Sequence, residues 1–419
     1  MVPWSKSTRW WPFLIDIDFL DVRRARVAGA GIVRETPVLS SRTLSERAGA
    51  TVVFKAENLQ RTGSFKLRGA LSKVAALGEA CAHGVVTGSA GNHAQAVAHA
   101  ARARGVACYV FMPESAPIAK VEAARGLGAE VQMVGATVDD ALEAAREFAA
   151  RDERVAFVHP FEDPYVIAGQ GTIGLELLDQ VPDLARVIVP IGGGGLISGV
   201  AIALKSERPS IEVIGVQAAS CAPVRGSLEA GKPVPVESAL TIADGIAVKR
   251  PGELTLSLIE RWVDDVVAVD EDEVAEAMVF LLERAKLVVE GAGAVGAAAL
   301  LSGRTGAARE GTTVVLLSGG NVDAGLLAEV ARRHESQAGR RLVLLASLPD
   351  RPGSLARLLA LVGELRANLL DVEHIREGFD LHVRETAVQL ILETRGQAHA
   401  RRVAESVRAA GYAEPRALR

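Results

Sequence analysis

The sequence contains few cysteines and few aromatic residues. Its 419 residues include three cysteines, Cys81, Cys108 and Cys221, which lie far apart in the chain. Their spacing fits neither a disulfide framework nor a metal site, so a reduced, cytoplasmic setting is expected. Aromatic residues make up 4% of the chain. The hydrophobic core must therefore consist mainly of aliphatic side chains.

The chain also lacks a strong excess of one charge and any long hydrophobic run. The formal net charge is −4 and no long basic segment is present, so no nucleic-acid partner is expected. No uncharged apolar stretch reaches the roughly 20 residues that cross a membrane. Residues 1–18 are expected to be an N-terminal extension, because their apolar run is too short and too interrupted for a signal peptide.

Short β-branched runs alternate with alanine-rich runs through most of the chain. Hydrophobic residues make up 49%, enough for a large core in two or three domains. Alternation of this kind predicts an α/β fold, with parallel strands and helices on both faces of the sheet. The expected strands are 52–55, 84–87, 107–111, 130–134, 186–190, 212–217 and 313–317, and the expected helices include 92–104, 118–127 and 138–150.

The pattern changes after Asn321. A helical and then polar segment ends near Gly339, and a β-α-β-β-α-β order follows, which predicts a ferredoxin-like sandwich with an antiparallel sheet. We place a domain boundary near residue 335. The expected domains are 19–335, with a smaller subdomain at about 60–160, and 340–419. The expected elements of the last domain are strand 342–347, helix 354–366, strands 368–375 and 386–393, helix 398–410 and strand 413–418.

A lysine stands where the first predicted strand passes into a helix. The segment 57–70 reads ENLQRTGSFKLRGA. Ser64 is a candidate helix N-cap, which places Lys66 in the first helical turn, where backbone N–H groups disfavour a cation. This position lowers the pKa of the amine and suits Schiff-base chemistry. From its residue type alone, Lys66 is more often a solvated surface residue.

Three further segments lie at strand ends and are rich in small residues. The segment 87–95, TGSAGNHAQ, can offer helix N–H groups to a carboxylate, although an ordinary turn fits equally well. The segment 190–199, PIGGGGLISG, has the layout of a phosphate cradle but not the spacing of a dinucleotide fingerprint or a Walker loop. The segment 317–321, LSGGN, ends a strand, and taken alone it fits a plain turn better. A serine hydroxyl at such a strand end would point into the crevice where open α/β sheets bind ligands.

Together these segments resemble the serine/threonine dehydratase branch of the pyridoxal-phosphate (PLP) enzymes with the tryptophan synthase β-like fold. The resemblance runs from about Val27 to Asn321 and extends to short segments at 158–161, 168–172, 244–246 and 290–294. It implies two open parallel-sheet α/β subdomains and a pyridoxal 5′-phosphate cofactor. The C-terminal part resembles an ACT domain through the turn DRPGSL at 350–355.

The resemblance also implies roles for individual residues. Lys66 would carry the cofactor and take the substrate's Cα proton. The cofactor ring would lie between Phe65 and Asn92, with Ser318 at its pyridine nitrogen. The phosphate would be held by Gly192, Gly193, Gly194, Gly195 and Leu196, and the substrate carboxylate by Ser89, Asn92 and His93.

The implied reaction is an α,β-elimination that converts L-threonine to 2-oxobutanoate and ammonia. L-Serine, which would give pyruvate, is an alternative substrate because one methyl group separates the two amino acids. PLP enzymes that replace the β-substituent of an amino acid, such as cysteine synthase, are a weaker alternative, because the segment at Ser89 is of the dehydratase type. A third interpretation, from a different class, is a non-catalytic amino-acid sensor that keeps the fold.

Two departures from serine racemases of this branch narrow the expected activity. Racemases carry a second serine where this chain has Ala90, a residue without an exchangeable proton, so racemisation is expected to be weak or absent. Racemases also place a glutamate of a divalent cation site where this chain has Gln217. No metal is therefore expected.

The ACT resemblance implies regulation by a small molecule. The turn at 350–355 borders an amino-acid effector site in ACT domains, and isoleucine or valine is the expected effector because the product can feed isoleucine synthesis. Catalytic and ACT domains of these families often pair. A homodimer or homotetramer is therefore expected.

Overall fold

The structure is a computed structural model that describes residues 17–238, 240–377 and 379–414. Most of the expected extension at 1–18 lies outside these residues. The chain divides into two compact units, Met1–Val322 and Asp323–Arg419. The expected boundary near residue 335 falls inside helix α13 (Ala324–Gln337), which packs against a strand of the second unit.

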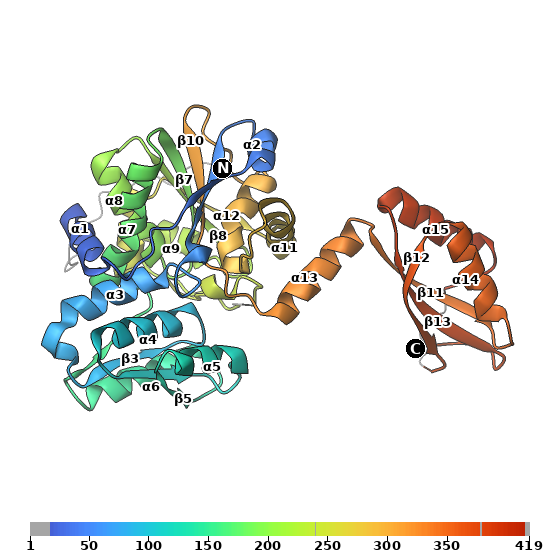
Figure 1. Cartoon of the computed structure of the whole chain (residues 1–419), viewed down its shortest axis with the longest axis horizontal. Helices are drawn as coiled ribbons and strands as arrows, with labels where there is room; N and C mark the ends of the chain where they lie inside the picture. The colour runs from blue at the N-terminus through green and yellow to red at the C-terminus, as the bar shows by residue number, and fades with distance from the viewer. Residues whose placement is uncertain (1–16, 239, 378, 415–419) are drawn as a thin grey trace. The chain divides into compact units, whose positions relative to one another are not determined.

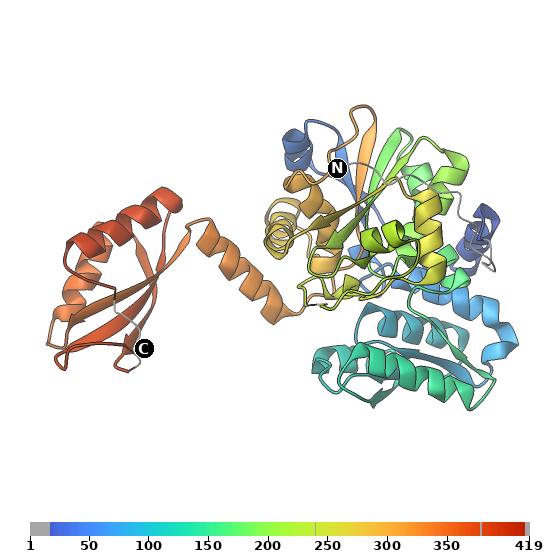
Figure 2. The same cartoon turned by 180° about the vertical axis from the view of Figure 1, so that it is seen from behind.

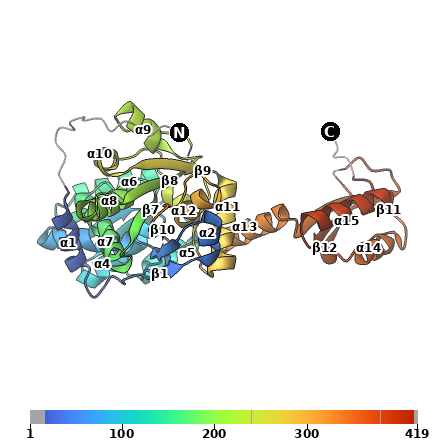
Figure 3. The ribbon, with the colours of Figure 1, turned by 90° about the horizontal axis from the view of Figure 1, so that it is seen from above.

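The larger sheet of the first unit has six strands in the order β1-β2-β10-β7-β8-β9. All neighbours are parallel except the edge pair β1 and β2. Helices cover both faces, with α7 and α8 on one side and α11 and α12 on the other (Figures 1 and 3). The strands are β1 (Val38–Ser40), β2 (Val52–Ala56), β10 (Thr312–Leu317), β7 (Leu184–Pro190), β8 (Glu212–Ala218) and β9 (Asp265–Val269).

The smaller sheet of the first unit is fully parallel, in the order β5-β4-β3-β6. It lies within the range expected for the smaller subdomain. Its strands are β3 (Gly84–Gly88), β4 (Cys108–Met112), β5 (Glu130–Met133) and β6 (Val155–Phe157).

The helices of the first unit follow the strand-helix alternation that the sequence predicts. Three of the expected helices, at 92–104, 118–127 and 138–150, are present with nearly the expected bounds. The helices are α1 (Phe19–Ala28), α2 (Arg42–Ala48), α3 (Lys66–Leu77), α4 (Asn92–Arg104), α5 (Ile118–Gly126), α6 (Val138–Ala150), α7 (Pro164–Gln180), α8 (Gly195–Glu207), α9 (Pro223–Ala230), α10 (Glu253–Trp262), α11 (Glu271–Phe280) and α12 (Gly291–Leu301).

The second unit contains helix α13, a three-stranded antiparallel sheet in the order β11-β13-β12, and two further helices (Figure 2). The described elements follow the expected order up to the last helix. The expected final strand at 413–418 lies largely outside the described residues. The elements are β11 (Arg341–Pro349), α14 (Ser354–Glu364), β12 (Asn368–Ile375), β13 (Glu385–Glu393) and α15 (Gln397–Ala409).

The core of the first unit is aliphatic, as the low aromatic content predicts. Val187, Val189, Val213 and Leu316 on the central strands are all fully buried. The three cysteines are free and buried, and the cytoplasmic setting stays a prediction. Among the described residues, no helix is both long and apolar enough to cross a membrane.

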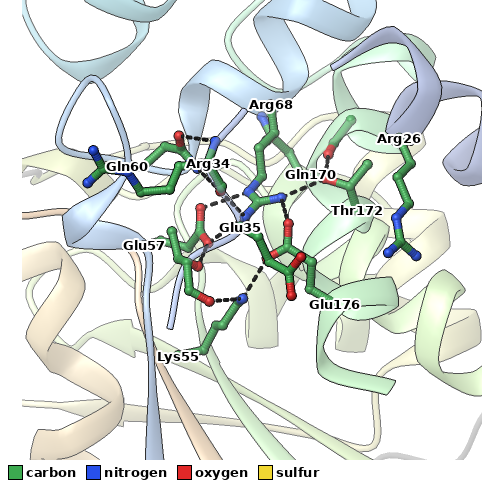
Figure 4. A network of polar contacts seen from close by, with 12 residues as sticks. Arg26, Arg34, Glu35, Lys55, Glu57, Gln60, Arg68, Gln170, Thr172 and Glu176 are labelled. Atoms are coloured by element: carbon green, nitrogen blue, oxygen red, sulfur yellow. Dashed lines mark hydrogen bonds and ion pairs between the residues drawn. The ribbon is translucent and has the colours of Figure 1, made fainter. Parts of the chain in front are cut away.

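A buried network of charged side chains lies beneath the start of α3 (Figure 4). Arg68 donates to both carboxylate oxygens of Glu57 at 2.8 Å and to Glu176 at 2.6 and 2.9 Å. Lys55 donates to Glu176 at 2.5 Å and to the carbonyl of Thr36 at 2.7 Å. Each buried cation thus faces a carboxylate, which offsets the cost of removing the charges from water.

Candidate active site

Lys66 is the first residue of α3, as the sequence predicts. Its Nζ donates to the carbonyl of Pro160 at 2.8 Å. Burial, opposed only in part by the nearby Glu290 carboxylate, lowers the pKa of the amine to about 8. A substantial fraction of this amine is therefore neutral near physiological pH, as a base or nucleophile requires.

The expected N-cap role of Ser64 is wrong. The cap position is Phe65, which already has helical dihedrals and makes no side-chain cap. Its backbone N–H donates to the carbonyl of Ser318 at 3.1 Å, which fixes the entry into α3 without a cap side chain. The Ser64 hydroxyl is buried and has no partner among the described residues.

The four consecutive glycines form the turn between β7 and α8. A Cβ on Gly193 would lie 2.3 Å from the Phe161 ring, and a Cβ on Gly195 would lie 2.9 Å from the Phe161 carbonyl. Gly194 has φ +96°, a conformation that favours glycine. A side chain at Gly193 or Gly195 would therefore collide with Phe161, which packs against the turn.

The backbone N–H groups of this turn are unusually free. Within the described residues, no hydrogen bond uses the N–H groups from Gly192 to Leu196. They lie at the N-terminus of α8, where the helix dipole adds a partial positive charge. This arrangement is suited to hold a phosphate group.

The segment with Ser89, Asn92 and His93 leads into the N-terminus of α4. The Ser89 hydroxyl accepts from the N–H of Gly91 at 3.2 Å, which closes a small turn. His93 is buried, and its Nε2 lies 3.0 Å from the carbonyl of Val158. Burial lowers the pKa of His93 to about 3, and the charge of Lys66 adds to this effect. The imidazole is therefore neutral.

A chain of side-chain amides ends on a carboxylate that the sequence analysis did not single out. Asn321 donates to Asn92 Oδ1 at 2.7 Å, and Asn92 Nδ2 donates to Glu290 Oε1 at 2.8 Å. Glu290 is 5% exposed. Burial, with a contribution from Asp244, raises the pKa of Glu290 to about 7. The signal in the sequence was the segment 290–294, which is part of the family resemblance but implied no role for Glu290.

Contacts across the first unit bring all four segments together. The Pro160–Phe161 pair joins Lys66 to the glycine turn, and Phe65 bonds to Ser318. Ser318 is 3% exposed, and its hydroxyl makes no hydrogen bond among the described residues. The segments from four strand ends thus surround one site at the carboxyl edges of two sheets, where open α/β sheets bind ligands.

The residues present fit pyridoxal phosphate. This cofactor carries an aldehyde, a phosphate and a pyridine nitrogen. The site offers an amine of lowered pKa, a glycine turn with unpaired N–H groups, and a hydroxyl without a partner among the described residues. Each function of the cofactor therefore has a matching group in this chain.

Gln217 is buried and bonded within the protein. Its Oε1 accepts from the N–H of Val224 at 3.0 Å, and its Nε2 donates to the carbonyl of Ile191. In the part of the chain that the structure describes, no group of three or more His, Cys, Asp or Glu side chains could hold a metal ion. The expectation of no metal stays a prediction.

Comparison with known proteins agrees with this geometry. Residues 30–319 match the family model described as pyridoxal-phosphate dependent enzyme. An L-threonine ammonia-lyase of Geobacter sulfurreducens is 50% identical over 382 residues, which cover 91% of this chain and 94% of that protein. A catabolic L-threonine dehydratase of Escherichia coli (strain K12) is 43% identical over 312 residues, 74% of this chain and 94% of that protein.

A solved structure of a threonine deaminase is also similar to this chain. The threonine deaminase of T.th. is 42% identical and superposes with a TM-score of 0.68, covering 73% of this chain and 99% of that chain. The matched family segment includes Lys66, the glycine turn and Ser318. The chain belongs to the family of pyridoxal-phosphate dependent enzymes.

Proposed function

We propose that this chain is a threonine ammonia-lyase that converts L-threonine to 2-oxobutanoate and ammonia. The observation that carries the proposal is the partly buried Lys66 amine of lowered pKa, linked through Pro160–Phe161 to a turn of unpaired glycine N–H groups. Relatives named threonine ammonia-lyase or threonine dehydratase, at 43–50% identity, support the choice of substrate.

Each polar group of the cofactor would have a partner among the residues of this site. Lys66 would hold it through the amine, Gly192 to Gly195 and Leu196 would hold its phosphate, and Ser318 would meet its pyridine nitrogen. Phe65 and Asn92 would flank the ring. When bound, pyridoxal phosphate supplies an electron sink that stabilises negative charge at the substrate's Cα.

Lys66 is the group proposed to move the Cα proton. Its lowered pKa leaves part of the amine neutral at working pH, as a base requires. Loss of this proton and of the β-hydroxyl, as water, leaves an enamine. Hydrolysis of that enamine releases 2-oxobutanoate and ammonia, so all atoms of threonine are accounted for.

His93 contributes to carboxylate binding through its backbone. The neutral imidazole must donate from Nε2 to the Val158 carbonyl, since a carbonyl can only accept. Nδ1 then carries a lone pair and cannot donate to an anion. The substrate carboxylate is therefore bound by N–H groups at the start of α4, together with the side chains of Ser89 and Asn92.

Ser318 favours elimination over other fates of the carbanion. A hydroxyl can share a hydrogen bond with the pyridine nitrogen but cannot stabilise a full positive charge there as a carboxylate does. With Ser318 as its partner, the pyridine nitrogen would carry less positive charge, which would favour loss of the β-hydroxyl.

The test is 2-oxo acid release from L-threonine and, separately, from L-serine by the purified enzyme, with Lys66→Ala as control. We expect faster turnover of threonine, and no turnover of either substrate by the variant. A clear preference for serine would replace the proposal with serine ammonia-lyase. No product from either amino acid, despite bound cofactor, would favour the amino-acid sensor.

We further propose that the second unit is an ACT-like regulatory domain that binds isoleucine or valine in a homodimer or homotetramer. The order β11, α14, β12, β13, α15 and the turn at Gly353, which has φ +84° and caps α14, support it. An effector must bind one conformational state better than another to change activity. Unchanged rate and threonine dependence at saturating isoleucine and valine would refute this regulation.

A further inference from the structure

The carbonyl that accepts from Lys66 belongs to the short segment 159–163, which lies between β6 and α7. Among the described residues, the Pro160 carbonyl is the one hydrogen-bond partner of Lys66 Nζ, at 2.8 Å. The position of this carbonyl therefore decides where the free amine points. The proline ring fixes φ of Pro160 but not the orientation of its carbonyl. That orientation depends on the contacts of the residues that follow.

His159 holds the opposite side of the same peptide group. The Pro160 carbonyl and the Phe161 N–H belong to one planar peptide. The Phe161 N–H donates to His159 Nδ1 at 3.2 Å, and the Glu162 N–H donates to the same atom at 2.8 Å. Nδ1 accepts only without a proton, and burial lowers the pKa of His159 to about 3, so the neutral ring keeps these bonds at working pH.

Asp163 ties the far end of the segment to helix α3. Its Oδ1 accepts from the N–H groups of Tyr165 and Val166 at 2.9 and 3.1 Å, and so caps α7. Its Oδ2 pairs with Lys73 Nζ at 2.6 Å, and the side chains of Lys73 and Asp163 are 14% and 11% exposed. The Lys73 ammonium also lies 5.3 Å from the centre of the Tyr165 ring. Solvent screens a pair this sheltered only weakly, so the attraction holds Asp163 against α3.

Lys66 and Lys73 both lie on α3, seven residues apart. Residues at this spacing occupy one face of a helix. Here that face contacts the segment twice, through Lys66 at Pro160 and through Lys73 at Asp163. Because only residues 161 and 162 separate the two points, a shift of Asp163 moves the Pro160 carbonyl as well.

We propose that the Asp163–Lys73 ion pair is a positioning device for Lys66. The pair holds the segment 159–163 at a fixed place along α3, so that the Pro160 carbonyl keeps the free Lys66 amine directed at the substrate's Cα proton. Asp163 and Lys73 act through Pro160 and are positioning residues, not catalytic residues. The inference rests on the proposed function, in which Lys66 moves this proton.

The first test compares L-threonine turnover by the parent holoenzyme, Asp163→Asn and Lys73→Met at saturating pyridoxal phosphate. Asparagine is as good an N-cap as aspartate, so Asp163→Asn keeps the cap of α7 and loses the ion pair. We expect kcat to fall about tenfold and KM to stay within about twofold, because a small displacement of a catalytic group slows the reaction more than it weakens binding. An unchanged kcat in both variants would overturn the proposal.

The double variant shows whether the two residues act as one unit. Each single change already breaks the pair, so Asp163→Asn combined with Lys73→Met should be no slower than the slower single variant. Losses that multiply would show that the two residues act separately, which contradicts a positioning pair.

A deuterium isotope effect separates positioning from a general loss of structure. Deuterium at Cα of L-threonine slows the step in which this proton is transferred. If the variants are slow because Lys66 is misdirected, their primary isotope effect on kcat should be at least as large as that of the parent. A smaller isotope effect would place the slowed step elsewhere and refute the proposal.

Hydrogen exchange tests the same pair without turnover. Lys73→Met leaves the sequence of the segment 159–163 unchanged, and in the cofactor-free full chain it should speed amide exchange of the peptide that covers these residues. Equal exchange in the parent and in Lys73→Met would show that the pair does not order the segment.

The matched control is Asp264→Asn. Asp264 Oδ2 pairs with Lys205 Nζ at 2.6 Å, and the side chains of Lys205 and Asp264 are 11% and 30% exposed, but Lys205 lies in the last turn of α8. This variant should keep the parent's kcat, isotope effect and exchange of the peptide at 159–163. An equal loss of kcat in the control would mean that breaking any sheltered ion pair slows the enzyme. Active parent enzyme with unaffected variants refutes this inference alone, whereas a parent without turnover refutes the proposed function and the inference with it.

Discussion

At Gly193 one methyl group decides whether the phosphate cradle can form. A Cβ there would meet the Phe161 ring at 2.3 Å, so Gly193→Ala must displace the ring or the turn, at a cost of about 1–3 kcal/mol. We expect the affinity for pyridoxal phosphate to fall about tenfold or more, measured by absorbance titration of the cofactor-free protein. The control is Gly226→Ala in α9, where an added Cβ meets nothing within 4 Å. Equal affinity of the two variants for pyridoxal phosphate would contradict the proposed role of the glycine turn in phosphate binding.

Glu290 should make the stability of the cofactor-free protein depend on pH. Its pKa rises from 4.5 to about 7 on folding, so between these values the folded state holds a proton that the unfolded state has released. This stabilisation is complete below pH 4.5 and is lost as pH rises through 7. Relative to Glu290→Gln, the parent should lose on the order of 3 kcal/mol over this window, since one pKa unit corresponds to about 1.4 kcal/mol. Urea unfolding at pH 5, 6, 7 and 8 checks this, and parallel curves for the two proteins would contradict it.

Ala90 predicts which products are formed from L-serine. It lies next to Ser89 and carries no group that could return a proton to the second face of Cα. We expect pyruvate from L-serine with little or no D-serine, measured by chiral chromatography. D-Serine formed at a rate comparable to that of pyruvate would show that another residue supplies the proton.

Among single residues, the sequence predicted those that lie inside a local motif. Lys66 stands at the expected helix start because its motif joins a strand to a helix. Glu290 could not be predicted as a site residue, because its burial and its bond to Asn92 bring together residues 198 positions apart in the chain. The error at Ser64 has a similar origin, since the entry into α3 is fixed by a long-range bond from Phe65 to Ser318.

At the scale of elements, α3 depends on ion pairs that lie beneath it (Figure 4). Glu176 on α7 faces both Lys55 and Arg68, and each of these cations is at most 1% exposed. Glu176→Gln leaves two buried positive charges with too little compensation, and we expect a loss of about 3–5 kcal/mol in the free energy of unfolding of the first unit. Urea unfolding followed by circular dichroism measures it.

The same helix provides the control for this prediction. Asp179, three residues further along α7, pairs with Arg26 at 3.1 Å, but the two side chains are 61% and 51% exposed. Asp179→Asn should cost less than about 1 kcal/mol, because water screens an exposed pair. A similar loss in both variants would mean that burial of the network does not determine its contribution.

The sequence predicted elements well where periodicity and buried β-branched runs determine them. Helices α4 and α6 and strand β12 have the expected bounds, since their patterns are local. The short antiparallel strand β1 was not predicted, because three residues carry no pattern and its place is set by pairing with β2. Likewise, the helical pattern of α13 was visible, but its packing against β11 was not, because that contact depends on the tertiary fold of the second unit.

At the scale of the whole molecule, catalysis and regulation should be separable. The contacts divide the chain after Val322, and a catabolic threonine dehydratase of E. coli aligns over 94% of its own length with only 74% of this chain. A relative that is shorter than this chain therefore occurs. We expect a chain that ends at Val322 to bind pyridoxal phosphate and to turn over threonine within a few-fold of the full chain, measured by 2-oxobutanoate release.

Any response of the full chain to isoleucine or valine should vanish in the shortened one, because the proposed effector site is removed. A shortened protein that keeps the response would place the effector site in the first unit. A folded shortened protein that binds the cofactor but does not turn over threonine would show that the second unit supports catalysis itself.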